Sequence, residues 1–267
     1  MHALALVALV LVAPLAAQTM VVQPTKAERT TETRTVRLAS GSTLKVENTN
    51  GFIRVEGWDK EEVQFTGEFK PSSKDEQVKV VLESSDRLLK IRGEYPKRTG
   101  WNFGFYKGPE CQMTLKVPYK VLPSLESVNG DVTLTGTFGA ASVETVNGAI
   151  LVKNQQAGLK AETVNGAINL EQVKGALNLE TVNGSIKGAA LDGQGQGVKA
   201  ETVNGSIQLQ IGGLKGHLKA ETVNGGITFK AKGAEQVEVK KRKVTATFPG
   251  GDQTIALETV NGSILIE

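Results

Sequence analysis

The sequence Glu-Thr-Val-Asn-Gly-x-Ile decides the fold of this 267-residue chain. Complete copies occupy residues 144–150, 162–168, 180–186, 201–207, 221–227 and 258–264, and a near copy with Ser127 in place of threonine occupies residues 126–132. The seven glycines are 18, 18, 18, 21, 20 and 37 residues apart. A fixed period of about 20 residues indicates a repeat protein whose units stack on one another.

We expect the Asn-Gly pair of every copy to occupy the same structural position. These pairs are Asn129 and Gly130, Asn147 and Gly148, Asn165 and Gly166, Asn183 and Gly184, Asn204 and Gly205, Asn224 and Gly225, and Asn261 and Gly262. The last gap is about two ordinary ones, so a degraded copy is expected near residues 241–244, where Lys-Arg-Lys replaces Val-Asn-Gly.

The alternation of apolar residues predicts two short strands in each repeat. In the copy at 180–186, Val182 and Ile186 have the same parity, whereas Leu177 and Leu179 have the opposite one. We therefore expect Val182 and Ile186 on one face, with a corner of the chain near residues 180–181. A second set of glycines marks a second bend in each repeat: Gly139, Gly158, Gly175, Gly197 and Gly216.

Two all-β architectures fit such a flattened coil. In a meander, Asn-Gly is the type I′ turn of a hairpin, and neighbouring strands run in opposite directions. In a β-solenoid, equivalent residues stack at about 4.8 Å, so the asparagines can form a hydrogen-bonded ladder and the isoleucines a dry core. Because only the second arrangement explains why so many positions repeat, we expect a single-stranded, right-handed β-helix or β-roll with coils of 18–21 residues.

The charge of the repeated glutamates restricts where they can lie in a stack of coils. Carboxylates 4.8 Å apart repel each other by roughly 0.9 kcal/mol in water and by far more when buried, so the row must face solvent. Lys160, Lys199 and Lys219 each stand two residues before a repeat glutamate and can offset the repulsion. A row of divalent cations is the alternative, but calcium-binding solenoids use aspartates in Gly-rich turns, so no metal site is predicted.

The first 17 residues have the character of a secretory signal. Residues 3–17 are apolar apart from Pro14 and end in Ala16-Ala17, which predicts export with cleavage after Ala17; an uncleaved anchor is the alternative. No later segment is apolar enough to span a bilayer, so a periplasmic, cell-surface or secreted protein is expected. Residues 18–33 are expected to be a flexible lead-in, 34–124 a diverged N-terminal β region and 125–267 the repeat solenoid.

Two segments are candidates for contact with a ligand or partner. The loop at 94–110 is expected either to bind with its aromatic rings or to fold back as a flap over an apolar end. Its aromatic residues are Tyr95, Trp101, Phe103, Phe105 and Tyr106. The basic run Lys240, Lys241, Arg242 and Lys243 is either a solvated bulge or a site for anionic glycans or lipid head groups.

The C-terminal coil ends in Ser263-Ile-Leu-Ile-Glu267 without a polar cap. An open strand edge recruits other strands, and terminal solenoid repeats normally carry a cap. We therefore expect self-association through this coil.

The residue types that carry catalysis are missing. After signal removal only His217 remains as a histidine, and no nucleophile motif, metal-spaced cluster or phosphate-binding loop is present. Cys111, the single cysteine, is expected to be buried, and a net charge of +3 gives no reason to expect a nucleic-acid partner. We expect no cofactor and no enzymatic activity; a polysaccharide-cleaving β-helix is the enzymatic alternative.

The segment 46–58, Val-Glu-Asn-Thr-Asn-Gly-Phe-Ile-Arg-Val-Glu-Gly-Trp, together with the later repeats, resembles the bacterial "putative adhesin" family over residues 34–267. The resemblance implies an exported β-solenoid of the head-domain type that acts in surface adhesion or envelope maintenance, with a glycan or an envelope protein as partner. It brings no catalytic residues. A structural or stress-sensing envelope protein is the non-adhesive alternative.

Overall fold

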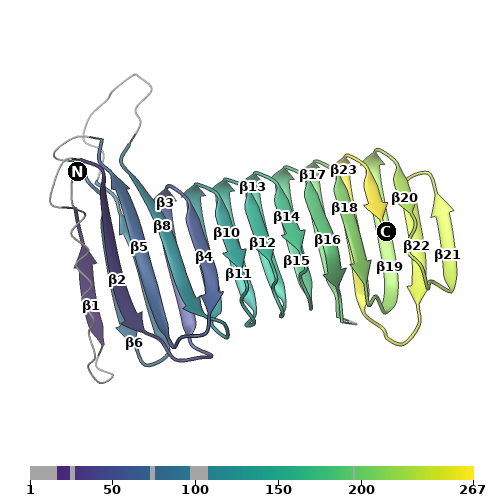
Figure 1. The fold of residues 1–267 in the computed structure, drawn as a ribbon. Helices are drawn as coiled ribbons and strands as arrows, with labels where there is room; N and C mark the ends of the chain where they lie inside the picture. The colour runs from purple at the N-terminus through teal and green to yellow at the C-terminus, as the bar shows by residue number, and fades with distance from the viewer. Residues whose placement is uncertain (1–16, 25–27, 73–75, 97–107, 195) are drawn as a thin grey trace, which may run out of the picture.

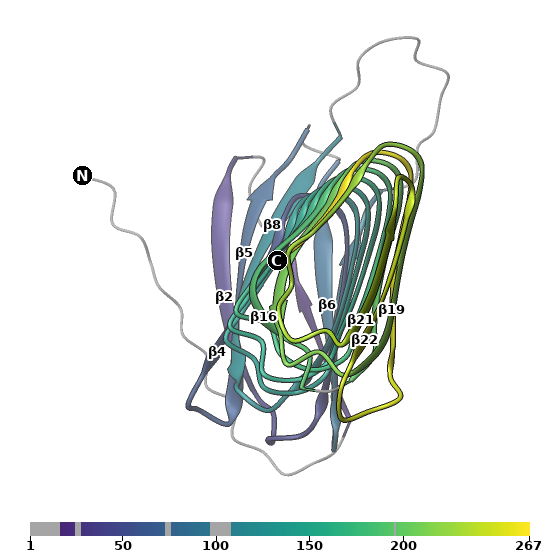
Figure 2. The ribbon, with the colours of Figure 1, turned by 90° about the vertical axis from the view of Figure 1, so that its right-hand side faces the viewer.

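The computed structural model describes residues 17–24, 28–72, 76–96, 108–194 and 196–267. Within them the chain forms strands and no helix, and thus no helix that could cross a membrane. The described strands make one sheet of 13 and one of 11, which lie face to face as a long, flattened rod (Figures 1 and 2). The predicted all-β solenoid is confirmed.

Each coil places a long strand in the 13-stranded sheet and a short strand in the 11-stranded sheet. The long strands are β9 (Leu122–Asn129), β11 (Ala141–Asn147), β13 (Leu159–Asn165), β15 (Leu177–Asn183), β17 (Val198–Asn204), β19 (Gly216–Asn224) and β23 (Thr254–Asn261). The short strands are β10 (Val132–Thr135), β12 (Ile150–Lys153), β14 (Ile168–Glu171), β16 (Ile186–Asp192), β18 (Ile207–Gly212), β20 (Ile227–Phe229) and β24 (Ile264–Ile266).

The coils pair in parallel and in register. Asn147 lies opposite Asn165, and Ile150 lies opposite Ile168, as expected for stacked coils and contrary to the meander. The strands β3 (Thr43–Asn50) and β4 (Ile53–Trp58) form a further coil at the N-terminal end of this stack, where Asn50 lies opposite Asn129.

The corner of each coil differs from the prediction. In β15, Leu177, Leu179 and Thr181 point into the core, whereas Val182 is 41% exposed. Every second residue of the strand therefore points into the core as far as the threonine. The chain turns at Val-Asn-Gly rather than at residues 180–181. Each buried threonine hydroxyl donates to a glycine carbonyl of the neighbouring coil at 2.8–3.2 Å, which offsets its burial.

The repeat glycines are required by the stacking rather than by a left-handed backbone. None of the seven has a positive φ, so the Asn-Gly corner is not the type I′ turn of a hairpin. A Cβ atom at Gly148 would collide with the carbonyl oxygen of Gly130 in the adjacent coil, and the other repeat glycines meet the same obstacle. Glycine is selected here because two backbones approach closely.

Mostly antiparallel strands close the N-terminal end of the stack. On one sheet they are β2 (Thr30–Arg37), β5 (Glu62–Lys70) and β8 (Glu110–Pro118), and on the other β1 (Gln18–Val22), β6 (Lys79–Ser85) and β7 (Leu88–Glu94). Residues 18–22 and 30–33 thus belong to strands, contrary to the predicted flexible lead-in. Cys111 in β8 is buried as predicted, and burial raises the pKa of its thiol to about 12.

The C-terminal end departs from chain order. The last coil, β23 and β24, lies between the coils β17–β18 and β19–β20 instead of on top of the stack (Figure 1). The prediction that residues 254–267 form an open edge is therefore wrong. The end of the 13-stranded sheet is instead formed by β22 (Lys243–Phe248), which pairs antiparallel with β19, and then by β21 (Gln236–Lys240).

This hairpin also replaces the degraded coil expected near residues 241–244. Lys241 and Arg242 form the turn between β21 and β22 rather than the corner of a coil. The edge strand β21 is exposed at every residue and carries Glu238 and Lys240, and charged side chains at a sheet edge oppose pairing with other strands.

Candidate functional site: a groove along the rod

A groove of about 1230 Å³ follows the outer face of the 13-stranded sheet. It is lined by the Glu, Thr and Val of each coil from Glu126 to Glu258, by Glu47, Asn48 and Thr49 of β3, and by an arginine near each end, Arg92 and Arg242. The coils from β3 to β19 occupy eight successive positions in the sheet. At about 4.8 Å per strand the groove is roughly 34 Å long.

A stripe of exposed valines forms the apolar part of the groove. Its members are 39–54% exposed and are Val128, Val146, Val164, Val182, Val203, Val260 and Val223 in spatial order. The prediction that the repeat valine shares the buried face of the isoleucine is wrong, so sequence analysis missed this stripe. The signal was available, because the parity of Leu177, Leu179 and Thr181 places Val182 on the outer face. A continuous apolar stripe on a surface marks a site of interaction.

The glutamate row runs beside the valine stripe and faces solvent, as predicted. Lys160 Nζ lies 2.9 Å from Glu144 Oε1 and 3.0 Å from Glu162 Oε1, so one lysine joins two successive coils. These hydrogen bonds raise the pKa of Lys160 to about 12. Lys199 joins Glu180 and Glu201 in the same way, at 2.8 and 3.0 Å.

Further lysines complete the pattern. Lys45 joins Glu47 and Glu126, at 3.1 and 3.0 Å. Lys219 and Lys243 both pair with Glu221 and lower the pKa of its carboxyl, Lys219 having the larger effect. Glu258 is the one carboxylate of the row that makes no ion pair with another described residue, but its charge also acts on Lys219, whose pKa is raised chiefly by Glu221 and to a smaller extent by Glu258. The row is thus largely neutralised.

An unbroken asparagine ladder lies next to the valine stripe. Each Nδ2 donates to the Oδ1 of the adjacent coil at 2.8–2.9 Å, in the order Asn224, Asn261, Asn204, Asn183, Asn165, Asn147, Asn129 and Asn50. The predicted ladder is confirmed, with one change of order at the inserted coil. The ladder holds the corners of all these coils in one line and so keeps the groove straight.

Replacing Asn165 with alanine is expected to lower the free energy of unfolding by about 1–2 kcal/mol, because it removes two ladder hydrogen bonds in which Asn165 is donor and acceptor. Asn224→Ala is the matched control, since Asn224 makes one such bond at the end of the ladder. Urea unfolding followed by circular dichroism measures both changes. An equal loss in the two variants would contradict a role for the ladder.

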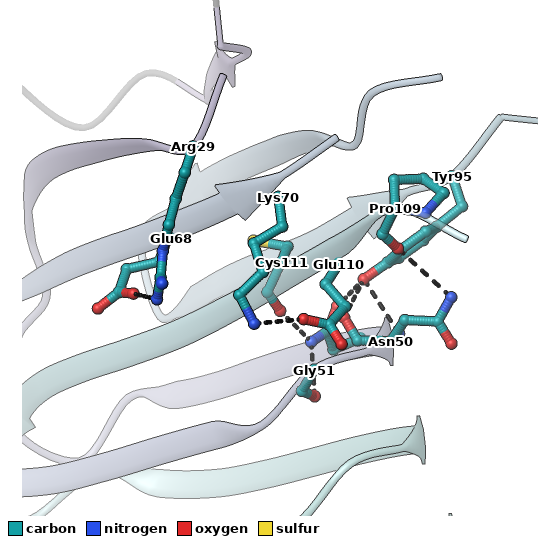
Figure 3. A network of polar contacts seen from close by, with 10 residues as sticks. Arg29, Asn50, Gly51, Glu68, Lys70, Tyr95, Pro109, Glu110 and Cys111 are labelled. Atoms are coloured by element: carbon teal, nitrogen blue, oxygen red, sulfur yellow. Dashed lines mark hydrogen bonds and ion pairs between the residues drawn. The ribbon is translucent and has the colours of Figure 1, made fainter. Parts of the chain in front are cut away.

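Of the predicted aromatic contacts, Tyr95 lies among the described residues and serves the fold. Its hydroxyl donates to Asn48 Oδ1 at 2.6 Å. It also accepts from the Asn50 N–H at 3.0 Å (Figure 3). Burial raises the pKa of this hydroxyl far above its usual value. Tyr95 therefore anchors the last asparagine of the ladder. Trp101, Phe103, Phe105 and Tyr106 lie outside the described residues.

The basic run lies at the opposite end of the rod from Tyr95. Lys240 pairs with Glu238 at 2.7 Å, Lys243 pairs with Glu221, and Arg242 lines the end of the groove. The structure thus brings two of the four predicted basic residues into ion pairs within the protein and one to the groove.

The acidic side chains of the groove are spread along the length of the rod. In the described part of the chain, no three His, Cys, Asp or Glu side chains lie close enough together to hold a metal ion. The groove residues repeat evenly along the rod, so no position along it concentrates an acid, a base and a nucleophile.

One protein-family model matches part of the chain. The model is described as Toastrack DUF4097 and matches residues 153–267, from the end of β12 to the C-terminal coil. No curated protein matches the chain.

Three solved structures from bacteria are similar at low identity. A "putative cell adhesion protein" from Clostridium sporogenes is 13% identical with a TM-score of 0.42, covering 90% of this chain and 99% of its own. A "putative adhesin" from Bacteroides fragilis is 14% identical with a TM-score of 0.47 and the same coverage. Another from Parabacteroides distasonis is 11% identical with a TM-score of 0.27, covering 90% of this chain and 98% of its own.

Proposed function

We propose that this protein is an exported, non-enzymatic binding module that lays an elongated partner along the groove of a rigid rod. The valine stripe carries the proposal: seven half-exposed valines stand in one line, on a face where polar residues would be stable. Their burial against a partner supplies the affinity, and the paired glutamates on one side set its orientation.

The partner is a protein of the cell envelope or of a neighbouring surface. Sugars are commonly held by stacking on aromatic rings, and the described residues that line the groove include none. An amphipathic helix matches the chemistry of the groove. Its apolar face can cover the valines while its basic side chains reach carboxylates such as Glu258. Adhesion, the activity named for the similar solved structures, is one use of such a contact.

Export is the second element of the proposal. The apolar run at 3–17 ends where the first described strand, β1, begins at Gln18. Cleavage after Ala17 would therefore leave every described strand intact, including the pairing of β1 with β6.

Introducing lysines at Val164 and Val182 is expected to abolish partner capture while leaving the fold intact. Both side chains point to solvent, so the double variant V164K/V182K should melt at the wild-type temperature. Two valines lost from the interface should weaken binding at least about tenfold. The measurement is a pull-down from envelope extracts with the mature protein, followed by titration of the captured partner.

The matched control is Q208K/Q210K, which adds the same two charges to exposed positions on the 11-stranded sheet. It should capture the partner as the wild type does. Equal loss in both double variants would show a general charge effect, and equal capture by all three proteins would show that the groove is not the site.

A further inference from the structure

The last coil of the chain occupies a position that two earlier coils leave open for it. On one side, Asn261 donates to Asn204 at 2.8 Å and Thr259 donates to the Gly205 carbonyl at 2.8 Å. On the other, Asn224 donates to Asn261 at 2.9 Å and Thr222 to the Gly262 carbonyl at 2.9 Å. The coil is thus held on both edges, although residues 216–248 come before it in the chain.

The coils of β9 and β11 carry Ser124-Leu125 and Ser142-Val143 before the repeat glutamate. From β13 to β19 the coils are of two kinds, and their spatial order alternates. In one kind the repeat glutamate follows Lys-Ala, with alanine buried and lysine outside; these are Lys160-Ala161, Lys199-Ala200 and Lys219-Ala220. In the other kind leucine is buried and lysine is absent; these are Asn178-Leu179 and Ala256-Leu257. Along the chain two Lys-Ala coils follow each other, but in the stack Leu257 lies between Ala200 and Ala220.

The alternation has a physical cause on both faces of the sheet. If β19 paired directly with β17, Ala200 and Ala220 would be neighbours at about 4.8 Å, and two alanines in succession would fill less of the core there than alternating alanine and leucine do. Outside, Lys199 and Lys219 would stand about 4.8 Å apart and repel each other by roughly 0.9 kcal/mol in water. In the structure Ala256 separates the two lysines. The gap between β17 and β19 therefore selects a coil with buried leucine and no lysine.

We propose that this gap is an acceptor site for the C-terminal coil of a second copy of the chain, so that two copies can exchange residues 254–267. Every contact of this coil with its neighbours is non-covalent and would form identically in trans. The connection at 249–253 is exposed and contains Gly250 and Gly251, as suits a hinge, and the His217 N–H holds its last residue, Gln253, at 2.8 Å. Exchange of an identical terminal element is a low-cost route to a dimer.

Exchange depends on concentration and on the order of folding. The coil in cis has an effective concentration in about the millimolar range, so dilute protein closes on itself. The acceptor site between β17 and β19 forms only when residues 216–229 stack on the rod and leave room for one coil between themselves and β17–β18. At high protein concentration, the C-terminal coil of another copy competes for that position during folding.

Two variants with one introduced cysteine each, in a Cys111→Ala background so that no other thiol can react, test the proposal with the full chain. Lys219 and Ala256 are in-register neighbours on β19 and β23 at exposed and half-buried positions. K219C and A256C, unfolded, mixed and refolded together at high concentration under mild oxidation, should form a disulfide-linked heterodimer. The heterodimer should disappear on reduction and should diminish when the mixture is diluted before refolding. The double variant K219C/A256C, refolded dilute, should form the same disulfide within one chain.

The control pair is K160C and N178C, which are in-register neighbours on the same face in coils that follow chain order. This pair should not cross-link when mixed. A heterodimer of equal yield from both pairs would indicate general misassembly and overturn the proposal. It is equally overturned if the mixed K219C and A256C proteins stay monomeric at every concentration while the double variant forms its internal disulfide.

Discussion

Replacing Gly184 with alanine is expected to lower the free energy of unfolding by about 3 kcal/mol or more. The new Cβ would collide with the carbonyl oxygen of Gly166 in the adjacent coil, and because the obstacle is backbone, no rotation of a side chain can relieve the collision. The two coils must separate, which breaks the asparagine and threonine hydrogen bonds between them. Overpacking against backbone belongs to the most damaging class of substitution. Urea denaturation measures the loss.

Gly226→Ala is the matched control for this prediction. Gly226 follows the repeat glycine of its own copy and has no positive φ, and a Cβ atom added to it would meet no other atom within 4 Å. Other copies carry alanine or serine at the equivalent place, as in Ala167 and Ser185. Its substitution should change stability by less than about 0.5 kcal/mol. A similar loss in both variants would contradict close stacking as the reason for the repeat glycines.

Replacing Leu257 with alanine is expected to lower the free energy of unfolding by about 3–5 kcal/mol, the upper part of the range for a buried leucine. The side chain is 1% exposed and lies between Ala200 and Ala220. Neither alanine can extend into the space that is vacated, so three alanines in a row leave a cavity in the centre of the rod. Differential scanning calorimetry and urea denaturation measure the change.

Leu265→Ala provides the control within the same coil. Leu265 lies on the outer face of β24, beside Gln208 and Thr228, and is only half-buried. Replacing it with alanine should lower the free energy of unfolding by about 1 kcal/mol. If the two substitutions had equal effects, Leu257 would not occupy the position between the two alanines, and the inserted order of the coils would be wrong.

The sequence predicted the repeated elements better than it predicted the ends. The period, the parallel stacking, the asparagine ladder and the lysines that join glutamates of successive coils all follow from residues that recur at one spacing. The C-terminal hairpin was mistaken for a degraded coil because Lys240 to Lys243 replace the repeat at the expected distance. The strand β1 and residues 30–33 of β2 were missed because they alternate little in polarity and are stabilised by pairing with β6 and β5.

The groove itself was not predicted. The positions of glutamate and lysine in each repeat predicted only the solvated glutamate row on one side of it. The valine was placed on the face of the isoleucine, because Val182 and Ile186 have the same parity. In the structure a buried threonine instead donates to a glycine carbonyl of the next coil, and the valine is left on the outer face.

By itself the sequence determined what each coil looks like: interactions between identical residues about 4.8 Å apart depend only on local spacing and are the same at every level of the stack. Only the tertiary structure decided the order of the coils. Because all repeats share one hydrogen-bonding pattern, backbone pairing alone does not set the order of the coils. The structure places the buried Leu257 between Ala200 and Ala220, and with it residues 254–267 between two coils that precede them in the chain.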